Sequence, residues 1–65
     1  MISIIIPTFN EVKNINSLID KLVNLLKDIE YEIIVVDDDS PDGTADEVSK
    51  LMEINENIQL ISRFG

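Results

Sequence analysis

Two short segments carry the residues whose types could do chemistry. Residues 7–11 read PTFNE and residues 37–43 read DDDSPDG, and each follows a run of branched residues. In a parallel α/β sheet, ligands bind beyond the carboxyl ends of the strands, so we expect the two segments to meet at one edge. Carboxylates gathered there suit Mg²⁺ or Mn²⁺, ions that often bridge phosphates. The acidic segments therefore permit binding of a cation, or of an anionic ligand that brings a cation with it.

Each of these residues also has a purely structural interpretation. Residues 37–39 can end a strand and cap the next helix, although three adjacent acids exceed what a cap needs. Glu11 is expected in the first turn of a helix, where an acid complements the dipole. Pro7 is expected to end its strand, and Gly43 to supply a positive φ in a turn. Phe9 is expected either to pack into the core or to stack on a base.

Composition narrows the function classes. The 65 residues hold 13 acids against 5 bases, a formal net charge of −8, which argues against binding a nucleic-acid backbone or an anionic membrane. Without cysteine or histidine, the chain has no thiolate or imidazole metal ligand and no histidine-dependent catalytic triad. Neither G-x-G-x-x-G nor a Walker A motif is present. No apolar run reaches the length of a membrane span, so we expect a cytoplasmic chain, peripheral to a membrane only in a longer version.

Runs of branched apolar residues predict three strands, at residues 1–6, 31–36 and 58–61. The first two of these strands lead directly into the two segments. With a helix between each pair of successive strands, the element order is β-α-β-α-β. This order predicts an α/β fold of the three-layer type, of which the chain forms one Rossmann-like half. Right-handed crossovers predict parallel strands in order 3-2-1 with both helices on one face. The first two strands are apolar at nearly every position, as in sheets covered on both faces. We therefore expect the bare face to be covered by more chain, by a second copy or by another subunit.

Helix signals lie in both intervals. Apolar residues at spacings of three and four predict an amphipathic helix over residues 12–29, with Asn10 as its cap. Thr44 and Glu47 fit a capping box that opens a second helix, which fades near residue 55. Asp37 still follows the alternation of the second strand and is expected on the same face as Val35. Asp38 and Asp39 lie further into the loop.

Both segments resemble signatures of the family 2 glycosyltransferases. Residues 4–11, IIIPTFNE, are similar to a branched run followed by Pro-Thr-Tyr-Asn-Glu, and residues 31–44, YEIIVVDDDSPDGT, are similar to the second signature. The form DDDSPDGT is most like the dolichol- or polyprenyl-phosphate mannose synthase branch. The resemblance implies a GT-A fold, of which residues 1–65 are a single N-terminal nucleotide-sugar-binding segment, truncated before the rest of the domain. The family's aromatic is usually tyrosine, and Phe9 keeps the stacking surface but not the phenolic hydrogen bond.

The resemblance also implies site residues and ligands. The donor would be a nucleoside diphosphate sugar, GDP-mannose by analogy with the branch, the acceptor a polyprenyl or dolichyl phosphate, and the metal Mg²⁺ or Mn²⁺. The family's metal-binding Asp-x-Asp, its acceptor site and any catalytic base lie beyond residue 65, so no catalytic residue and no metal ligand is assigned here. Residues 61–65 resemble the third strand running into a Gly-rich loop. Contacts to the nucleotide sugar are expected at Pro7, Phe9, Glu11, Val36, Asp38 and, as a weaker candidate, Asp39.

We therefore expect a segment that binds the nucleoside of a sugar donor and does not transfer the sugar by itself. One alternative is a non-catalytic nucleotide-binding or assembly module, a gene remnant whose bare sheet face pairs with itself or with a partner. Another is a receiver-like signalling domain, which also builds an acidic pocket on a parallel sheet. Receiver domains carry a phospho-acceptor aspartate at the end of strand three, and here that strand ends in Ser62 and Arg63.

Overall fold

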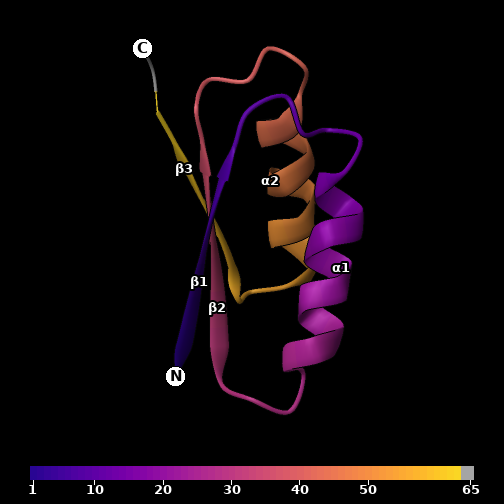
Figure 1. Ribbon diagram of the computed structural model, residues 1–65, viewed down its shortest axis with the longest axis vertical. Coiled ribbons are helices and arrows are strands. Elements are labelled where there is room, and N and C mark those ends of the chain that lie inside the picture. The colour runs from indigo at the N-terminus through magenta and orange to yellow at the C-terminus, as the bar shows by residue number, and fades with distance from the viewer. Residues whose placement is uncertain (64–65) are drawn as a thin grey trace.

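The computed structural model describes residues 1–63, and its elements alternate between strand and helix. The strands are parallel and lie in the order β1-β2-β3, which is the predicted order read from the other edge. Both helices pack on one side of this sheet (Figure 1). The predicted Rossmann-like half is therefore confirmed. The elements are β1 (Ile2–Thr8), α1 (Ile15–Leu26), β2 (Tyr31–Asp37), α2 (Thr44–Ile54) and β3 (Ile58–Ser62).

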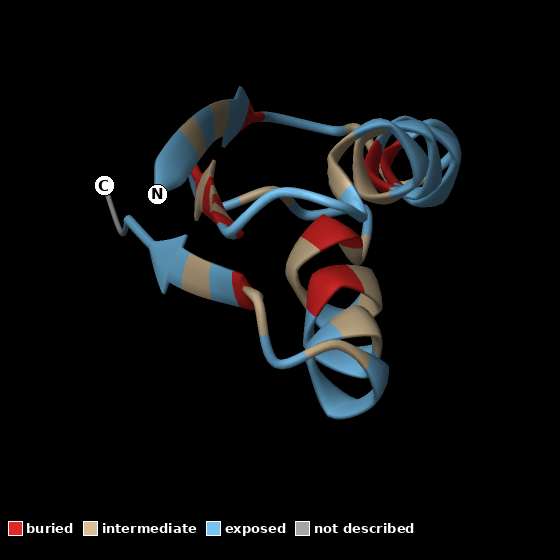
Figure 2. Cartoon of the chain, turned by 90° about the horizontal axis from the view of Figure 1, so that it is seen from below, coloured by how far each residue is buried: buried red, intermediate tan, exposed pale blue. Residues whose placement is uncertain are grey.

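The core lies between the central strand and the two helices (Figure 2). Along β2 every second residue from Tyr31 to Asp37 is buried, because alternate side chains of a strand point to opposite faces. Ile33 and Val35 are fully buried there, since helices cover that face. The buried apolar set is Ile15, Ile19, Tyr31, Ile33, Val35, Val48 and Ile58.

The opposite face of the sheet has no helix over it in the described part of the chain. Two rows of paired residues cross it, Ile5-Ile34-Gln59 and Pro7-Val36-Ile61. The outer strands leave Ile5 64% and Ile61 51% exposed. The expectation of one uncovered apolar face is confirmed for these residues, and we call it the open face.

Helix α1 is shorter than predicted at both ends. The sequence pattern indicated residues 12–29 with Asn10 as the cap, whereas α1 spans Ile15–Leu26 and Asn14 holds the N-cap position without a side-chain cap bond. The carbonyl of Glu11 accepts hydrogen bonds from the amides of Asn14 (2.9 Å) and Ile15 (2.8 Å), so a separate turn precedes the helix. Neither helix of residues 1–63 is long and apolar enough to cross a membrane.

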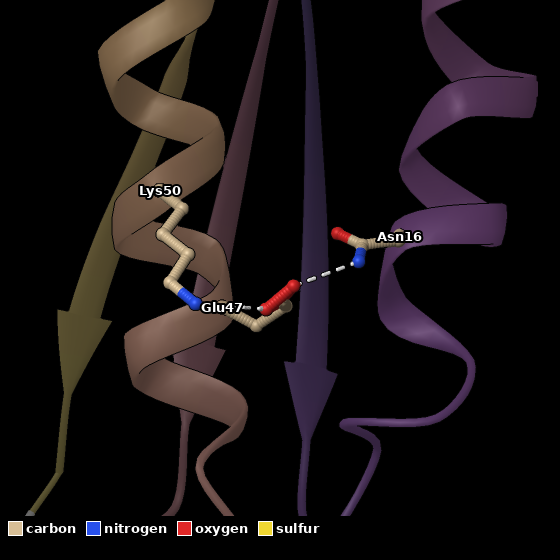
Figure 3. A network of polar contacts seen from close by, with 3 residues as sticks. All are labelled: Asn16, Glu47 and Lys50. Atoms are coloured by element: carbon tan, nitrogen blue, oxygen red, sulfur yellow. Dashed lines mark hydrogen bonds and ion pairs between the residues drawn. The ribbon is translucent and has the colours of Figure 1, made fainter.

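The predicted capping box of α2 is wrong. Gly43 is the N-cap, with φ 92°, and Thr44 is the first helical residue. The positive φ expected for Gly43 is confirmed. The side chain of Glu47 points to the neighbouring helix, where it accepts a hydrogen bond from Asn16 Nδ2 (2.9 Å), and it lies 3.9 Å from Lys50 Nζ (Figure 3). Glu47 therefore joins α1 to α2 rather than capping its own helix.

Pro7 does not end its strand. β1 continues to Thr8, and Pro7 pairs in register with Val36. Ile2 N donates to Glu30 O and Thr8 O accepts from Asp38 N, the residues on either side of β2. The odd-numbered residues of β1 between them therefore direct their backbone groups to the free edge. A proline at such a position costs the sheet no hydrogen bond, which is why the prediction failed.

Candidate functional site

The loops after β1 and β2 lie at the same end of the molecule and are joined by hydrogen bonds (Figure 1). Three successive backbone amides of the first loop donate, and three side-chain oxygens of the second loop accept. The pairs are Asn10 N to Ser40 Oγ (2.9 Å), Glu11 N to Thr44 Oγ1 (3.0 Å) and Val12 N to Asp42 Oδ2 (3.2 Å). Side chains of residues 40–44 therefore hold the backbone of residues 10–12, and we call this set of bonds the loop clasp.

Asp37 is the buried anchor of the clasp. Its carboxylate accepts hydrogen bonds from Thr8 Oγ1 (2.9 Å), Ser40 N (3.0 Å) and Ser40 Oγ (2.6 Å). Burial raises the pKa of Asp37, but the hydrogen bonds from Ser40 and Thr8 together outweigh it, so the pKa lies below its ordinary value. Asp37 is therefore ionised at neutral pH, and its oxygens are occupied by protein donors.

Asp42 also has a structural role, at the start of α2. Thr44 donates to Asp42 Oδ1 from both its hydroxyl (2.5 Å) and its amide (3.0 Å). The pKa of Asp42 is lowered mainly by the bond from the Thr44 hydroxyl, with the amides of Val12 and Thr44 adding to it. The Asp42 carboxylate thus replaces the missing cap bond of the helix and holds Val12 at the same time.

Four of the predicted site residues line a single hollow of about 260 Å³ at the carboxyl edge. Pro7 and Val36 are neighbours across the β1–β2 pair and belong to the open face. The ring of Phe9 is 56% exposed, so the expectation that it packs into the core is wrong. Asp38 is exposed and tied to β1 by its amide, which donates to Thr8 O (3.0 Å). The lining of this open-face hollow is Pro7, Thr8, Phe9, Val36, Asp38 and Arg63.

Glu11 lies on the other side of β1. It lines a hollow of about 210 Å³ on the helix side, together with Asn14 and Leu18 of the α1 region. Glu11 Oε2 accepts a long hydrogen bond from Asn14 Nδ2 (3.4 Å). The first turn of α1 contains no acid, so the expected first-turn role of Glu11 is wrong. Pro7 and Thr8 line both hollows and separate Glu11 from the open-face hollow.

Asp39 forms part of the turn that follows β2. It is exposed and takes a φ of 53°, a left-handed conformation that aspartate tolerates better than most residues. It lines neither hollow at this edge. The structure therefore brings together four of the six predicted residues and leaves Glu11 and Asp39 outside that group.

The acids of the two segments do not form a metal centre within residues 1–63. No group of three or more carboxylates in this part of the chain is placed to hold a metal ion. Asp37 and Asp42 are occupied by protein donors, and Asp38 and Glu11 line different hollows. The described residues therefore form no cluster that would hold Mg²⁺ or Mn²⁺, and the metal expected for a longer version stays a prediction.

Arg63 was not predicted from the sequence. Alternation along β3 puts Arg63 on the same face as Ile61, because Ile58 is buried towards the helices. Its amide donates to Asp37 O (2.8 Å), which extends the β2–β3 ladder by one residue. That alternation was readable in the sequence, but only the sheet places Arg63 beside Asp38. The start of the expected Gly-rich loop, at residues 64–65, lies outside the described residues.

A larger hollow of about 480 Å³ lies between the two helices, away from both segments. Its walls are apolar side chains such as Ile19, Val23 and Leu51, with Asn16 and Asp20 at its polar positions. None of the residues predicted to bind a nucleotide sugar lines it. The largest of the three hollows is therefore not the one that the predicted site residues line.

The fold is a Rossmann-like half, with both motif loops at the carboxyl ends of its parallel strands. The sequence model described as "Glycosyl transferase family 2" matches residues 3–63. The chain therefore belongs to this family, as its two segments predicted.

Similar proteins come from archaea and bacteria. A "Dolichol-phosphate mannosyltransferase" of Pyrococcus furiosus is 48% identical over 50 residues, which is 77% of this chain and 14% of that protein. A "Poly(ribitol-phosphate) beta-glucosyltransferase" of Bacillus spizizenii is 40% identical over 63 residues, 95% of this chain and 10% of that protein. An "Undecaprenyl-phosphate 4-deoxy-4-formamido-L-arabinose transferase" of Proteus mirabilis is 33% identical over 58 residues, 86% of this chain and 18% of that protein. The chain thus spans less than a fifth of the length of these relatives.

Proposed function

We propose that this chain supplies the nucleoside-binding part of the donor site of a glycosyltransferase. The observation that carries the proposal is the open-face hollow, where Phe9, Val36 and Asp38 come together from two segments. An exposed aromatic ring offers a stacking surface to a base, and an ionised carboxylate accepts hydrogen bonds from ring N–H groups. The volume of about 260 Å³ is below the roughly 300 Å³ at which sites begin to enclose a whole small molecule, so it suits one end of the donor.

The complete enzyme would transfer a hexose from a nucleoside diphosphate sugar to a polyprenyl phosphate. Two relatives support the acceptor class, since their names contain dolichol phosphate and undecaprenyl phosphate. Mannose, and with it GDP-mannose, is favoured by the Pyrococcus furiosus mannosyltransferase at 48% identity. Mg²⁺ or Mn²⁺ would belong to the complete enzyme, and residues 1–63 provide no ligand set for it.

The 65-residue chain by itself should bind a nucleoside weakly and transfer no sugar. Transfer requires stabilisation of a departing diphosphate, and the described residues gather no metal-binding cluster for that task. Sugar transfer by the purified chain without another subunit would refute this part of the proposal.

Calorimetric titration of the purified chain with GDP, UDP and their sugars, with and without Mn²⁺, tests the binding site. We expect weak binding that does not depend on the metal and is lost in Asp38→Ala. The matched control is Asp28→Ala, which removes an equally exposed aspartate between α1 and β2, outside both edge hollows. Unchanged binding in Asp38→Ala, or equal losses in the two variants, would contradict the proposal.

A second candidate function is a non-catalytic assembly module, and the open face favours it. Ile5 and Ile61 are more than half exposed on a sheet that has helices on its other side. Membership of the glycosyltransferase family argues against the receiver-like alternative.

A further inference from the structure

Arg63 brings a positive charge to the open-face hollow, which Asp38 also lines. The chain has five basic residues, and Arg63 alone among them lines either of the two hollows at the carboxyl edge. Its backbone is fixed by the bond from its amide to Asp37 O (2.8 Å), so the side chain starts from a defined position on the open face. Lys50, in contrast, lies beside Glu47 on α2.

Asp38 and Arg63 line the same hollow without forming an ion pair with each other. Among residues 1–63 the one ion pair within 4.0 Å joins Lys50 to Glu47. The hollow therefore presents a free acceptor at Asp38 and a free donor fork at Arg63, with the exposed ring of Phe9 in the same lining. A planar ligand that has donors along one edge and acceptors along another would satisfy both groups.

We propose that Arg63 is a specificity-determining residue that selects guanine in this hollow, an inference that rests on the proposed nucleoside-binding function. Guanine offers O6 and N7 as adjacent acceptors, a pair that an arginine fork bonds bidentately. Its N1–H and N2 amino group are donors that suit the carboxylate of Asp38. Adenine places an amino group where guanine has O6, and uracil has no N7, so neither base gives Arg63 two acceptors.

Nucleotide analogues separate this role from simple charge attraction. Isothermal titration of the full chain with GDP, 7-deaza-GDP, ADP and UDP measures the preference, and the same series is repeated with Arg63→Gln. One good bidentate contact contributes about 5- to 150-fold in affinity. The wild-type chain should bind GDP more tightly than 7-deaza-GDP, which keeps O6 but lacks N7, by the N7 part of that factor. In Arg63→Gln, GDP binding should weaken by a similar factor, and the difference between GDP and 7-deaza-GDP should disappear.

Guanosine and a charge-matched variant complete the test. Arg63→Lys keeps the charge but not the fork, so we expect it to lose the preference for N7 as Arg63→Gln does. If Arg63 instead holds phosphate, Arg63→Gln would weaken GDP, ADP and UDP equally and leave guanosine unchanged, which would overturn the proposal.

The outcomes distinguish the two proposals from each other. GDP binding that is lost in Asp38→Ala but unchanged in Arg63→Gln would overturn the role of Arg63 and leave the nucleoside site standing. Absence of binding by every nucleoside and nucleotide in the wild-type chain would overturn both. Circular dichroism of each variant checks that the sheet remains folded, and Arg63 is exposed, so we expect no loss of structure.

Discussion

At the scale of single residues, neighbouring acids of one motif have opposite roles. Asp37 is buried at 1% exposure and surrounded by protein donors, whereas Asp38 is exposed and lines the open-face hollow. The difference follows from strand geometry, because consecutive side chains point to opposite faces. The acidic run of this chain therefore contains both a buried structural anchor and an exposed carboxylate.

Replacement of these two acids by asparagine should separate stability from binding. Asp37→Asn replaces one carboxylate oxygen, which accepts hydrogen bonds, by an amide NH₂ group, which can only donate. Because Ser40 and Thr8 are themselves donors to this side chain, we expect the free energy of unfolding to fall by about 1–3 kcal/mol. Asp38→Asn, the matched control, should leave stability within about 0.5 kcal/mol and weaken nucleoside binding. Urea denaturation followed by circular dichroism measures the stability, and equal losses in both variants would contradict the assignment.

The lowered pKa of Asp37 predicts an acid-sensitive contribution to stability. A carboxyl group whose pKa is lower in the folded than in the unfolded chain stabilises the fold above its unfolded pKa. The contribution is lost as pH falls through the folded value, which lies below 3.8. The difference in unfolding free energy between the wild type and Asp37→Asn should be constant from pH 7 to about pH 5 and shrink as the pH falls below about 4. A difference that grew on acidification would show the sign to be wrong.

At the scale of elements, the clasp explains why the second segment needs hydroxyl and carboxyl side chains at fixed spacing. Residues 10–12 do not belong to α1, and their amides have no helical partners. The three acceptors from the second segment satisfy them and hold the loop that carries Phe9. The position of Phe9 in the site thus depends on residues about 30 positions away in the sequence.

Thr44 offers a direct test of the clasp. Its buried hydroxyl accepts from Glu11 N and donates to Asp42. Thr44→Val keeps the shape but leaves the Glu11 amide without its acceptor, so we expect a loss of about 1–3 kcal/mol and weaker nucleoside binding. Thr44→Ser retains the hydroxyl and should keep more of the binding than Thr44→Val. Amide hydrogen exchange should show faster exchange at Glu11 in Thr44→Val alone, and unchanged exchange there would argue against the clasp.

At the scale of the whole molecule, the described chain has two layers, one sheet and one layer of helices. Its strands nevertheless carry apolar residues on both faces, as strands between two helix layers do. The helices cover one face, and the open face carries Ile5, Ile34, Val36 and Ile61. Helix α1 adds apolar exposure of its own, since Leu25 is 76% exposed. A face of this kind is typical of surfaces that another layer covers.

Self-association is the expected behaviour of the isolated chain. Sedimentation velocity over a range of concentrations should show the sedimentation coefficient rising with concentration, because apolar surface leaves water when two open faces meet. Ile5→Thr combined with Ile61→Thr keeps branched residues in the strands and removes apolar surface, so it should shift the distribution towards monomer. The control is Leu25→Thr, which changes an apolar residue on α1 instead. A wild-type chain that stays monomeric at all concentrations would refute the prediction.

The sequence by itself determined the order of the elements, the parallel sheet and the edge where the two segments meet. Branched runs, helical spacing and short connections are local patterns, and each reports on a few neighbouring residues. The positive φ of Gly43 was also predicted from its immediate neighbours in the turn. The errors at Asn10 and the capping box lie where a tertiary partner replaces the local one. Those at Pro7, Phe9 and Glu11 depend on where the residue lies in the folded sheet and loop.

Only the tertiary structure decided which member of each motif is buried and which lines the open-face hollow. Asp37 and Asp38 are the same residue type. The strand register turns Asp37 to the helix face, where Thr8 and Ser40 bond to it, and turns Asp38 to the opposite face. Arg63 enters the same hollow from a third strand, a neighbour set by sheet pairing rather than by spacing in the chain. Hydrogen bonds between segments some 30 residues apart have no short-range signature. This is the physical reason that the sequence predicted the edge where the two motifs meet but not the contacts between them.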